Sequence, residues 1–231
     1  MNKNDVCGKF PDFCYKAFTC EKYAKQFMEN GSFRMGCLYS YRTIEDKSRR
    51  DTTEGTGRTI EPGIVISCGV SPNPEEKTIW TKEFGYQEHH IEQRNLVYCF
   101  CTSLPTVNLN YMRNQFGQYI VKIGNPKEMA VEINEYFFNE GQSILIVGCP
   151  VDYNKGKKQN RELTNSERAD LTYKQKCETF IKDHEFRIVA IRLGEVCTKP
   201  CIFLDEDEEV EPECKIIEIN LGKKLSYLSQ V

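Results

Sequence analysis

Short apolar runs, separated by polar or glycine-containing segments, are the feature that most limits what this chain can fold into. Apolar runs of this length, rich in β-branched and aromatic residues, are typical of strands in the interior of a domain. The four clearest are Ile64–Gly69, Leu96–Thr102, Ser143–Cys149 and Glu185–Leu193. Ile64–Gly69 is apolar throughout, so we expect it to be buried on both faces.

Helical patterns alternate irregularly with these strands, which favours an α+β fold. Helices are predicted from Cys20 to Glu29 with Thr19 as the cap, from Pro126 with Asn125 as the cap, and from Ser166 to Ile181. Further strands are predicted at Ser32–Leu38, at Gln118–Ile123, near Ile202 and at Lys215–Ile219. There is no internal repeat and no long linker, so residues 1–231 are expected to form a single domain, with an acidic surface loop at 205–214.

Composition narrows the expected compartment and partners. The 231 residues include 12 cysteines, but several stand inside apolar runs, where a cysteine behaves as a small buried residue. No apolar run approaches the roughly 20 residues of a membrane span, and the first residues have no secretory apolar region. We therefore expect a cytoplasmic protein with free thiols and no membrane partner. The net charge of −3 argues against strong non-specific binding to nucleic acid.

The segment from Ser32 to Arg42 combines a strand with nucleotide-binding side chains. Arg34 lies within the expected strand, and Tyr39, Tyr41 and Arg42 follow it. A tyrosine offers a flat ring for stacking, and an arginine offers a planar fork that matches a phosphate. Arg34 facing the solvent without a ligand is the alternative.

Two other strand ends carry polar groups. Leu96–Thr102 is followed by Ser103, whose hydroxyl could orient a carboxylate or simply cap a turn. Glu185 opens the late strand, and Arg187 lies two residues further on the same strand face. A carboxylate beside an arginine in a buried strand indicates either a structural ion pair or a functional site.

The order of these segments resembles a large bacterial domain family of unknown function, whose members have a "CFS" or "CFT" strand and a closing F-x-x-E-x-E-[YFW]-R motif. The corresponding segments here are GSFRMGCLYSYRTIEDKSRRDTTE (31–54), YCFCTS (98–103) and FIKDHEFR (180–187), with Asp183 in place of the first glutamate. The same segments resemble the arginine–serine–glutamate class of ADP-ribosyltransferases. That resemblance implies split mixed sheets with flanking helices and a cleft for NAD.

The second resemblance also implies roles for the candidate residues. Glu185 would be catalytic, stabilising the positive charge that develops on the ribose when nicotinamide leaves, and Ser103 would orient it. NAD would be bound by Arg34, Tyr39, Tyr41, Arg42 and Arg187. The acceptor would be a nucleic acid or a protein, and such transferases include toxins and antiviral effectors.

Two other functions fit the sequence. In a non-catalytic nucleic-acid or protein binding module, Glu185–Arg187 would be a structural pair and the arginines between Arg42 and Arg58 a docking surface. A metal-dependent nuclease could use Glu45, Asp46, Asp51 and Glu54, although all four fall in one loop, which is poor geometry for a metal site. His89-His90 lacks the spacing of a zinc motif, and we expect no metal.

Overall fold

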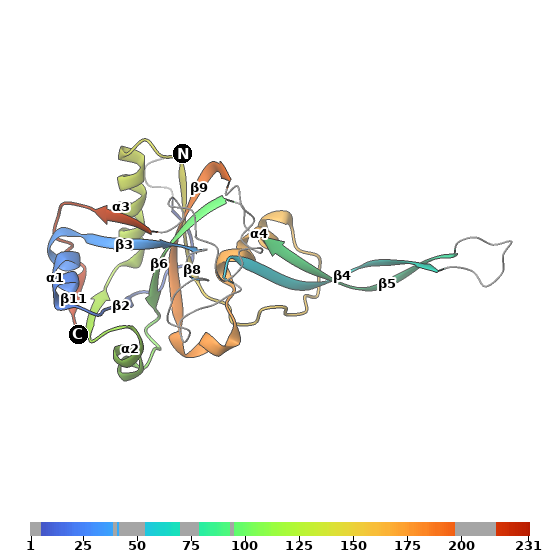
Figure 1. The fold of residues 1–231 in the computed structure, drawn as a ribbon, viewed down its shortest axis with the longest axis horizontal. Coiled ribbons are helices and arrows are strands. Elements are labelled where there is room, and N and C mark those ends of the chain that lie inside the picture. Colours follow the sequence, from blue (N-terminus) through green and yellow to red (C-terminus); the bar gives the residue numbers. More distant parts are fainter. Residues whose placement is uncertain (1–5, 39–40, 42–53, 70–78, 93–94, 197–215) are drawn as a thin grey trace, which may run out of the picture.

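A computed structural model describes residues 6–38, 41, 54–69, 79–92, 95–196 and 216–231, with the backbone alone at 64–69, 79–84, 92, 95 and 193–196. Figure 1 shows a body in which helices surround a curved sheet, and a two-stranded ribbon that projects from one end of it. The arrangement is α+β, as predicted.

Nine of the described strands form the sheet of the body. Its main path runs β1 (Val6–Gly8), β8 (Ile144–Pro150), β9 (Glu185–Val196), β6 (Asn95–Ser103), β2 (Cys14–Phe18), β7 (Tyr119–Ile123) and β11 (Leu228–Gln230). Beside this path, β3 (Ser32–Cys37) pairs with β6 and with β10 (Ile216–Asn220). The β1–β8 pair is parallel and the other pairs are antiparallel, so the sheet is mixed.

Two helices cover the first face of the sheet. They are α1 (Glu21–Asn30) and α3 (Pro126–Asn139), and their apolar side chains join those of β6 and β9 in the main core. As the sequence predicts, Asn125 caps α3, its side chain accepting a hydrogen bond from the amide of Glu128 at 3.1 Å. For α1 the predicted cap is wrong, because the cap position is Cys20, which makes no side-chain hydrogen bond.

The second face carries the other two α-helices, α2 (Leu109–Phe116) and α4 (Asn165–Lys174). Alternate residues of β6 and β9 point this way, among them Cys99 and Val189, and they pack with Tyr173 of α4. Cys99 and Cys149 are buried free thiols, as predicted. Met112 of α2 packs against Ile120 of β7 in a separate small core.

The projecting ribbon consists of β4 (Thr56–Gly69) and β5 (Ile79–Glu92), which we call the arm. Its register runs from Thr56 opposite Glu92 to Gly69 opposite Ile79. Near its base the arm rests on α4, where Thr59 and Glu61 are fully buried. The strand predicted at Ile64–Gly69 is confirmed, and its backbone belongs to the arm, where it pairs with β5 (Figure 1). The burial predicted for its side chains lies outside what the structure describes.

The predicted helix from Ser166 to Ile181 is wrong in its second half. α4 ends at Lys174, Gln175 is extended, and a 3₁₀ turn, η2 (Glu178–Asp183), follows. The break is held by tertiary contacts, since the side chain of Gln175 accepts a hydrogen bond from the amide of Arg58 at 2.9 Å. The amide of Lys176 also bonds to the carbonyl of Asp152 at 3.1 Å.

Several predictions lie outside the described residues. They concern Tyr39, Arg42, the strand near Ile202 and the acidic loop at 205–214. Among the residues that are described, no helix is long and apolar enough to cross a membrane.

Candidate functional site

Five charged side chains meet on the second face of the sheet, between α2 and α4. They are Glu54, Lys176, Asp183, Glu185 and Arg187, and we call them the Arg187 cluster. Arg187 is 1 % exposed and Glu54 is 1 % exposed. Charged groups buried this deeply must be paired, because an uncompensated charge would cost several kcal/mol (order of magnitude). The stability of the cluster therefore requires each of its charges to have a partner.

Arg187 is the centre of the cluster. Its Nη1 and Nη2 atoms donate to the two oxygens of Glu54 at 2.7 and 3.0 Å, which is the two-pronged geometry that suits a guanidinium. Its Nε donates to Glu185 Oε1 at 2.7 Å, and Nη1 also reaches the carbonyl of Tyr173 at 3.0 Å. Burial opposes the charged form, but Glu185 and Glu54 raise the pKa of Arg187 well above its usual value.

Both oxygens of Glu185 are engaged. Oε1 accepts from Arg187, and Oε2 accepts from Lys176 Nζ at 2.9 Å. Burial alone would raise the pKa of Glu185, but the charges of Arg187 and Lys176 outweigh it and hold the pKa well below its usual range. The pKa of Lys176 shifts in the opposite direction. Burial alone would lower it, but the charge of Glu185 outweighs burial and raises it. The three groups are therefore all ionised at neutral pH.

A left-handed residue allows two carboxylates to reach the same lysine. His184 has φ 44° and ψ 48°, a conformation unusual for a residue with a side chain. Asp183 before it lies 3.4 Å from Lys176 Nζ and accepts a hydrogen bond from the hydroxyl of Tyr111 at 2.8 Å. Burial raises the pKa of Asp183, and burial together with this hydrogen bond raises the pKa of Tyr111 to about 12.

Four of the predicted site residues come together on this face. Ser103 of β6 lies directly opposite Glu185 of β9, and Cys101 lies opposite Arg187. The Tyr41 hydroxyl accepts a hydrogen bond from Cys101 Sγ at 3.5 Å. Tyr41, Ser103, Glu185 and Arg187 are thus neighbours, but the transferase hypothesis requires Arg34 beside them as well. The carboxylate of Glu185, however, is held by cations rather than by Ser103.

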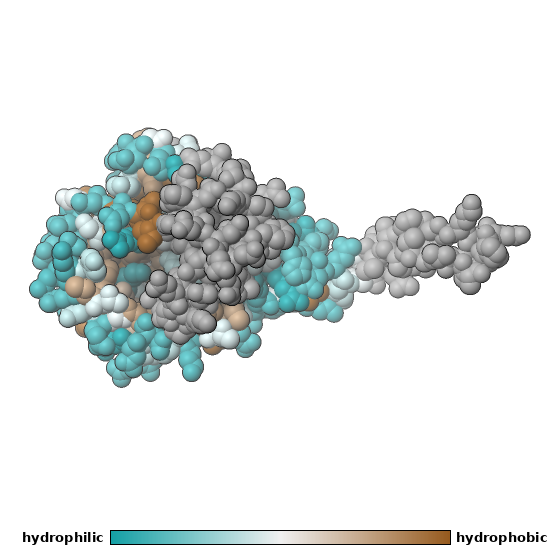
Figure 2. Space-filling model, viewed as in Figure 1, coloured by the Kyte–Doolittle hydropathy of each residue, from teal (hydrophilic) through white to brown (hydrophobic). Residues whose placement is uncertain are grey.

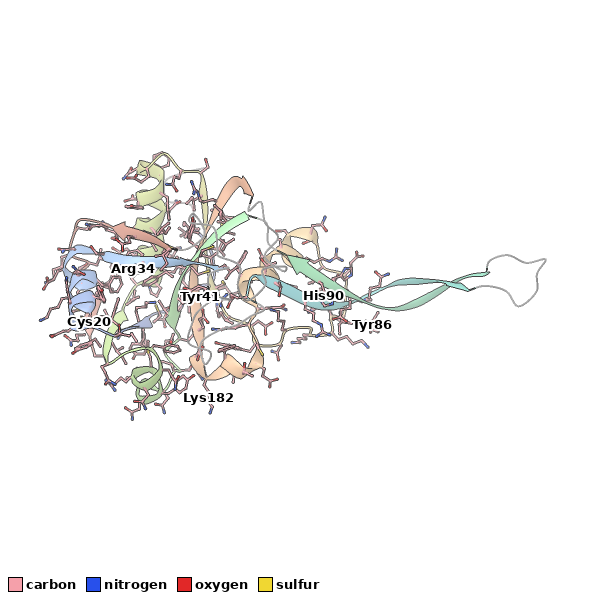
Figure 3. All side chains as sticks on the ribbon, in the orientation of Figure 1. Cys20, Arg34, Tyr41, Tyr86, His90 and Lys182 are labelled. Carbon is pink, nitrogen blue, oxygen red and sulfur yellow. The ribbon has the colours of Figure 1, made fainter. Side chains whose placement is uncertain are left out.

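Arg34 does not join this group. It is exposed on β3, and its Nη2 lies 2.7 Å from Glu218 Oε1 on the neighbouring strand β10. Its guanidinium also lies 6.0 Å from the ring of Tyr23. Figure 3 shows Arg34 separated from Tyr41 along the body. In this conformation its partners belong to the protein surface, so the predicted grip on a phosphate would require Glu218 to be displaced.

An open pocket of about 690 Å³ lies at the base of the arm, and we call it the arm pocket. Arg58 and His90 come from the arm, Lys155 and Lys157 come from the loop after β8, and Cys177 and Glu178 come from the start of η2. The loop is fixed to β4 by backbone hydrogen bonds, from Gly156 to the carbonyl of Arg58 at 3.0 Å and from Gln159 to the carbonyl of Ile60 at 2.7 Å. The described surface around this base is strongly hydrophilic (Figure 2).

Tyr153 connects the arm pocket with the Arg187 cluster. Its side chain lines the pocket, and its hydroxyl accepts a hydrogen bond from the amide of Glu185 at 2.8 Å. Burial is the main cause that raises the pKa of Tyr153 above its usual value, so the hydroxyl remains protonated at neutral pH and has a proton left to donate.

Sequence reasoning missed several of these residues. The sequence pattern predicts Lys176 inside a continuous helix, and only the tertiary break after α4 turns it toward Glu185. For Glu54 the sequence suggests only a metal ligand of a nuclease, whereas it is the partner of Arg187. For Lys155 and Lys157 there was a usable signal, because a glycine between lysines in the sequence NKGKK is typical of an exposed basic turn.

Comparison with protein-family models, with curated proteins and with solved structures found no match to this chain. Within the described part of the chain, no group of three or more histidine, cysteine, aspartate or glutamate side chains is arranged to hold a metal ion.

Proposed function

We propose that this protein is a binding module that receives an anionic, phosphate-bearing ligand in the arm pocket. The carrying observation is the convergence of Arg58, Lys155 and Lys157 on one open pocket, with Glu178 as the carboxylate of the lining. Guanidinium and ammonium groups are the side chains that bind phosphate through charge-assisted hydrogen bonds.

The difference in charge pairing between the cluster and the pocket supports binding rather than catalysis. In the Arg187 cluster each charge already has a charged partner within the protein. In the arm pocket, by contrast, Lys157 is exposed on a turn, and the ion pair of Arg58 with Glu88 is itself exposed to solvent. A structural ion-pair network beneath an open basic pocket is the arrangement that a rigid binding site needs.

Calorimetric titration with ADP, and with adenosine as the uncharged comparison, tests this proposal. ADP should bind and adenosine should not. Lys157→Ala should weaken ADP binding about tenfold, the equivalent of ~1.4 kcal/mol. Lys127→Ala, which removes an exposed lysine on α3, is the matched control and should have no effect. Equal binding of adenosine and ADP, or equal behaviour of the two lysine variants, would contradict the proposal.

An NAD-consuming ADP-ribosyltransferase is the second candidate. It is favoured by one observation, the gathering of Tyr41, Ser103, Glu185 and Arg187 on one sheet face, with Tyr153 leading to the arm pocket. For catalysis the carboxylate of Glu185 would have to exchange a contact with Arg187 or Lys176 for one with the ribose.

Release of nicotinamide from NAD tests the second candidate. The protein should release it, and Glu185→Gln should slow the release by roughly a hundredfold or more. Because that variant disturbs a buried ion pair, Ser103→Ala is the milder companion, and circular dichroism should verify the fold of both. No release above the rate in buffer would reject the transferase.

A further inference from the structure

One face of the arm continues the basic lining of the arm pocket. Residues directly opposite each other in a two-stranded sheet share a face, and so do alternate residues along each strand. The register places Arg58 opposite His90, Ile60 opposite Glu88 and Pro62 opposite Tyr86. We call the face that carries Arg58, Tyr86, Glu88 and His90 the arm face. Figure 3 shows Tyr86 and His90 near each other at the base of the arm.

The reverse face of the arm packs against the body near the base, and the arm face lies on the opposite side. Thr59 and Glu61 point to that reverse side and are fully buried. Two atoms of Arg168 on α4 bind Glu61, Nε at 3.1 Å and Nη2 at 2.7 Å. The base of the arm is therefore anchored from behind, and its opposite side is left to the solvent.

Tyr86 adds an aromatic surface to this face. The Nζ atom of Lys158 lies 3.4 Å from the centre of its ring, yet the residue remains 50 % exposed. Tyrosine is amphipathic, and an exposed ring beside cations can stack on a nucleobase while the cations hold the phosphates. A ligand that consists of a phosphate alone would make no use of this ring, so the ring favours a ligand that also carries a base.

Glu88 partly neutralises the positive charge of the arm face. Its carboxylate forms an ion pair with Arg58 Nε and lies 3.1 Å from His90 Nε2. A phosphate that binds Arg58 would compete with this carboxylate. Glu88 is therefore a residue whose removal should strengthen the binding of an anion at this place, an effect that misfolding does not produce.

We propose that the arm face and the arm pocket together bind a single-stranded nucleic acid, with its phosphates along Arg58, Lys157 and Lys158 and a base stacked on the face of the Tyr86 ring opposite Lys158. This inference rests on the proposed binding of a phosphate-bearing ligand, and it names the class of that ligand. The exposed ring selects a single strand over a duplex, because the bases of a duplex are already stacked on each other.

Fluorescence anisotropy with a labelled oligothymidylate and with a DNA duplex of equal charge tests the inference on the full chain. The single strand should bind more tightly than the duplex. Tyr86→Ala should weaken single-strand binding by about five- to a hundredfold, the range that corresponds to the loss of one stacked base. Tyr86→Phe is the matched control, since it keeps the ring, and should bind within about twofold of the natural protein.

Glu88→Gln should tighten single-strand binding by about two- to fivefold, the scale of one exposed charge. The inference is overturned, while the proposed function stands, if ADP binds with the expected dependence on Lys157 but the single strand and the duplex bind alike or Tyr86→Ala has no effect. Both proposals fail together if neither ADP nor the oligonucleotide binds.

Discussion

At the scale of the residue, Arg187 shows how a buried charge becomes tolerable. Its guanidinium is 1 % exposed and donates hydrogen bonds to Glu54, Glu185 and the carbonyl of Tyr173. These partners come from the segment before β4, from β9 itself and from α4. One side chain therefore ties α4 and β9 to Glu54, which lies 133 residues before Arg187 in the chain.

We expect Arg187→Lys to lower the free energy of unfolding by about 3–5 kcal/mol, because an ammonium cannot replace the two-pronged contact with Glu54 and leaves buried carboxylate oxygens unpaired. Urea denaturation followed by circular dichroism measures this. Arg34→Lys alters the exposed pair with Glu218 and should change stability by less than about 0.5 kcal/mol. Similar losses in the two variants would contradict the role given to Arg187.

Glu61 gives a pH dependence with a defined sign. The hydrogen bond from Arg168 is the main cause that lowers its pKa from the ordinary 4.5. A carboxyl group with a lowered pKa in the folded state stabilises the fold above its unfolded pKa, and this contribution is lost as the pH falls through the folded pKa. The stabilisation is thus complete at neutral pH and disappears in acid below about 4.5.

Glu61→Gln should therefore be less stable than the natural protein at pH 7, by about 3 kcal/mol, and the difference should shrink as the pH falls below about 4.5. Thermal unfolding between pH 3 and pH 7, at roughly half-unit steps, would reveal it. Glu21→Gln, in the exposed pair with Lys25, is the matched control and should leave the pH profile unchanged. A difference that stays constant with pH would show that Glu61 acts through packing alone.

At the scale of the element, local signals and tertiary contacts determine different helix ends. Asn125 caps α3 through its own side chain, which the sequence predicted. The cap position of α1 is Cys20, which makes no side-chain hydrogen bond, so the capping hydrogen bond predicted for Thr19 is not formed. The two helices thus provide a direct comparison.

Asn125→Ala should lower the free energy of unfolding by about 1 kcal/mol, the usual effect of removing a helix cap. Thr19→Ala should change it by only a few tenths of a kcal/mol, roughly what surface substitutions cost. Denaturant titration of both variants measures the difference. Equal losses would mean that Asn125 matters for a reason other than its hydrogen bond with the amide of Glu128.

The elements with strong local patterns were predictable, and those shaped by distant contacts were not. β3, β6, β7, β8 and β9 lie where apolar runs predicted them. The strand β2 was missed because its five residues, CYKAF, carry little periodicity and form a strand by pairing with β6 and β7. The end of α4 was missed for the same reason, since Asp152 and Arg58 hold the extended segment after it.

The candidate site shows the same division. The pairing of Glu185 with Arg187 follows from their i, i+2 spacing on a strand, and the sequence predicted it as one of two readings. The positions of Lys176 and Glu54 beside Glu185 and Arg187 depend on the tertiary fold. The arm pocket was not predicted, because its cations come from two segments, β4 and the loop after β8, that no local pattern connects.

At the scale of the whole molecule, the arm is joined to the body only near its base in the part of the chain that the structure describes. Glu61 and Thr59 are buried there, and Gly63 lies opposite Gly85 just beyond them. Figure 1 shows the remainder of the ribbon extending away from the sheet and the helices. We therefore expect the body, together with the buried base of the arm, to fold without the distal part of the ribbon.

Replacing residues 64–84 by an Asn-Gly turn should leave the free energy of unfolding within about 1 kcal/mol of the full chain, because an Asn-Gly turn closes a two-stranded hairpin and the buried anchors remain. Cooperative thermal unfolding measured by circular dichroism would verify this. A shortened protein that unfolds without cooperativity would show that the distal arm contributes to the core. The variant retains Arg58 and Tyr86, so its binding of oligothymidylate should persist.

The paired ends of the arm have a consequence for how proteins of this architecture can vary. Thr56 and Glu92 face each other where the ribbon leaves and re-enters the body. Insertion of two residues in each strand lengthens such a ribbon by about 7 Å and keeps the side chains beyond the insertion on their present faces. The length of the arm can therefore change in such steps without altering the ion pairs of the body.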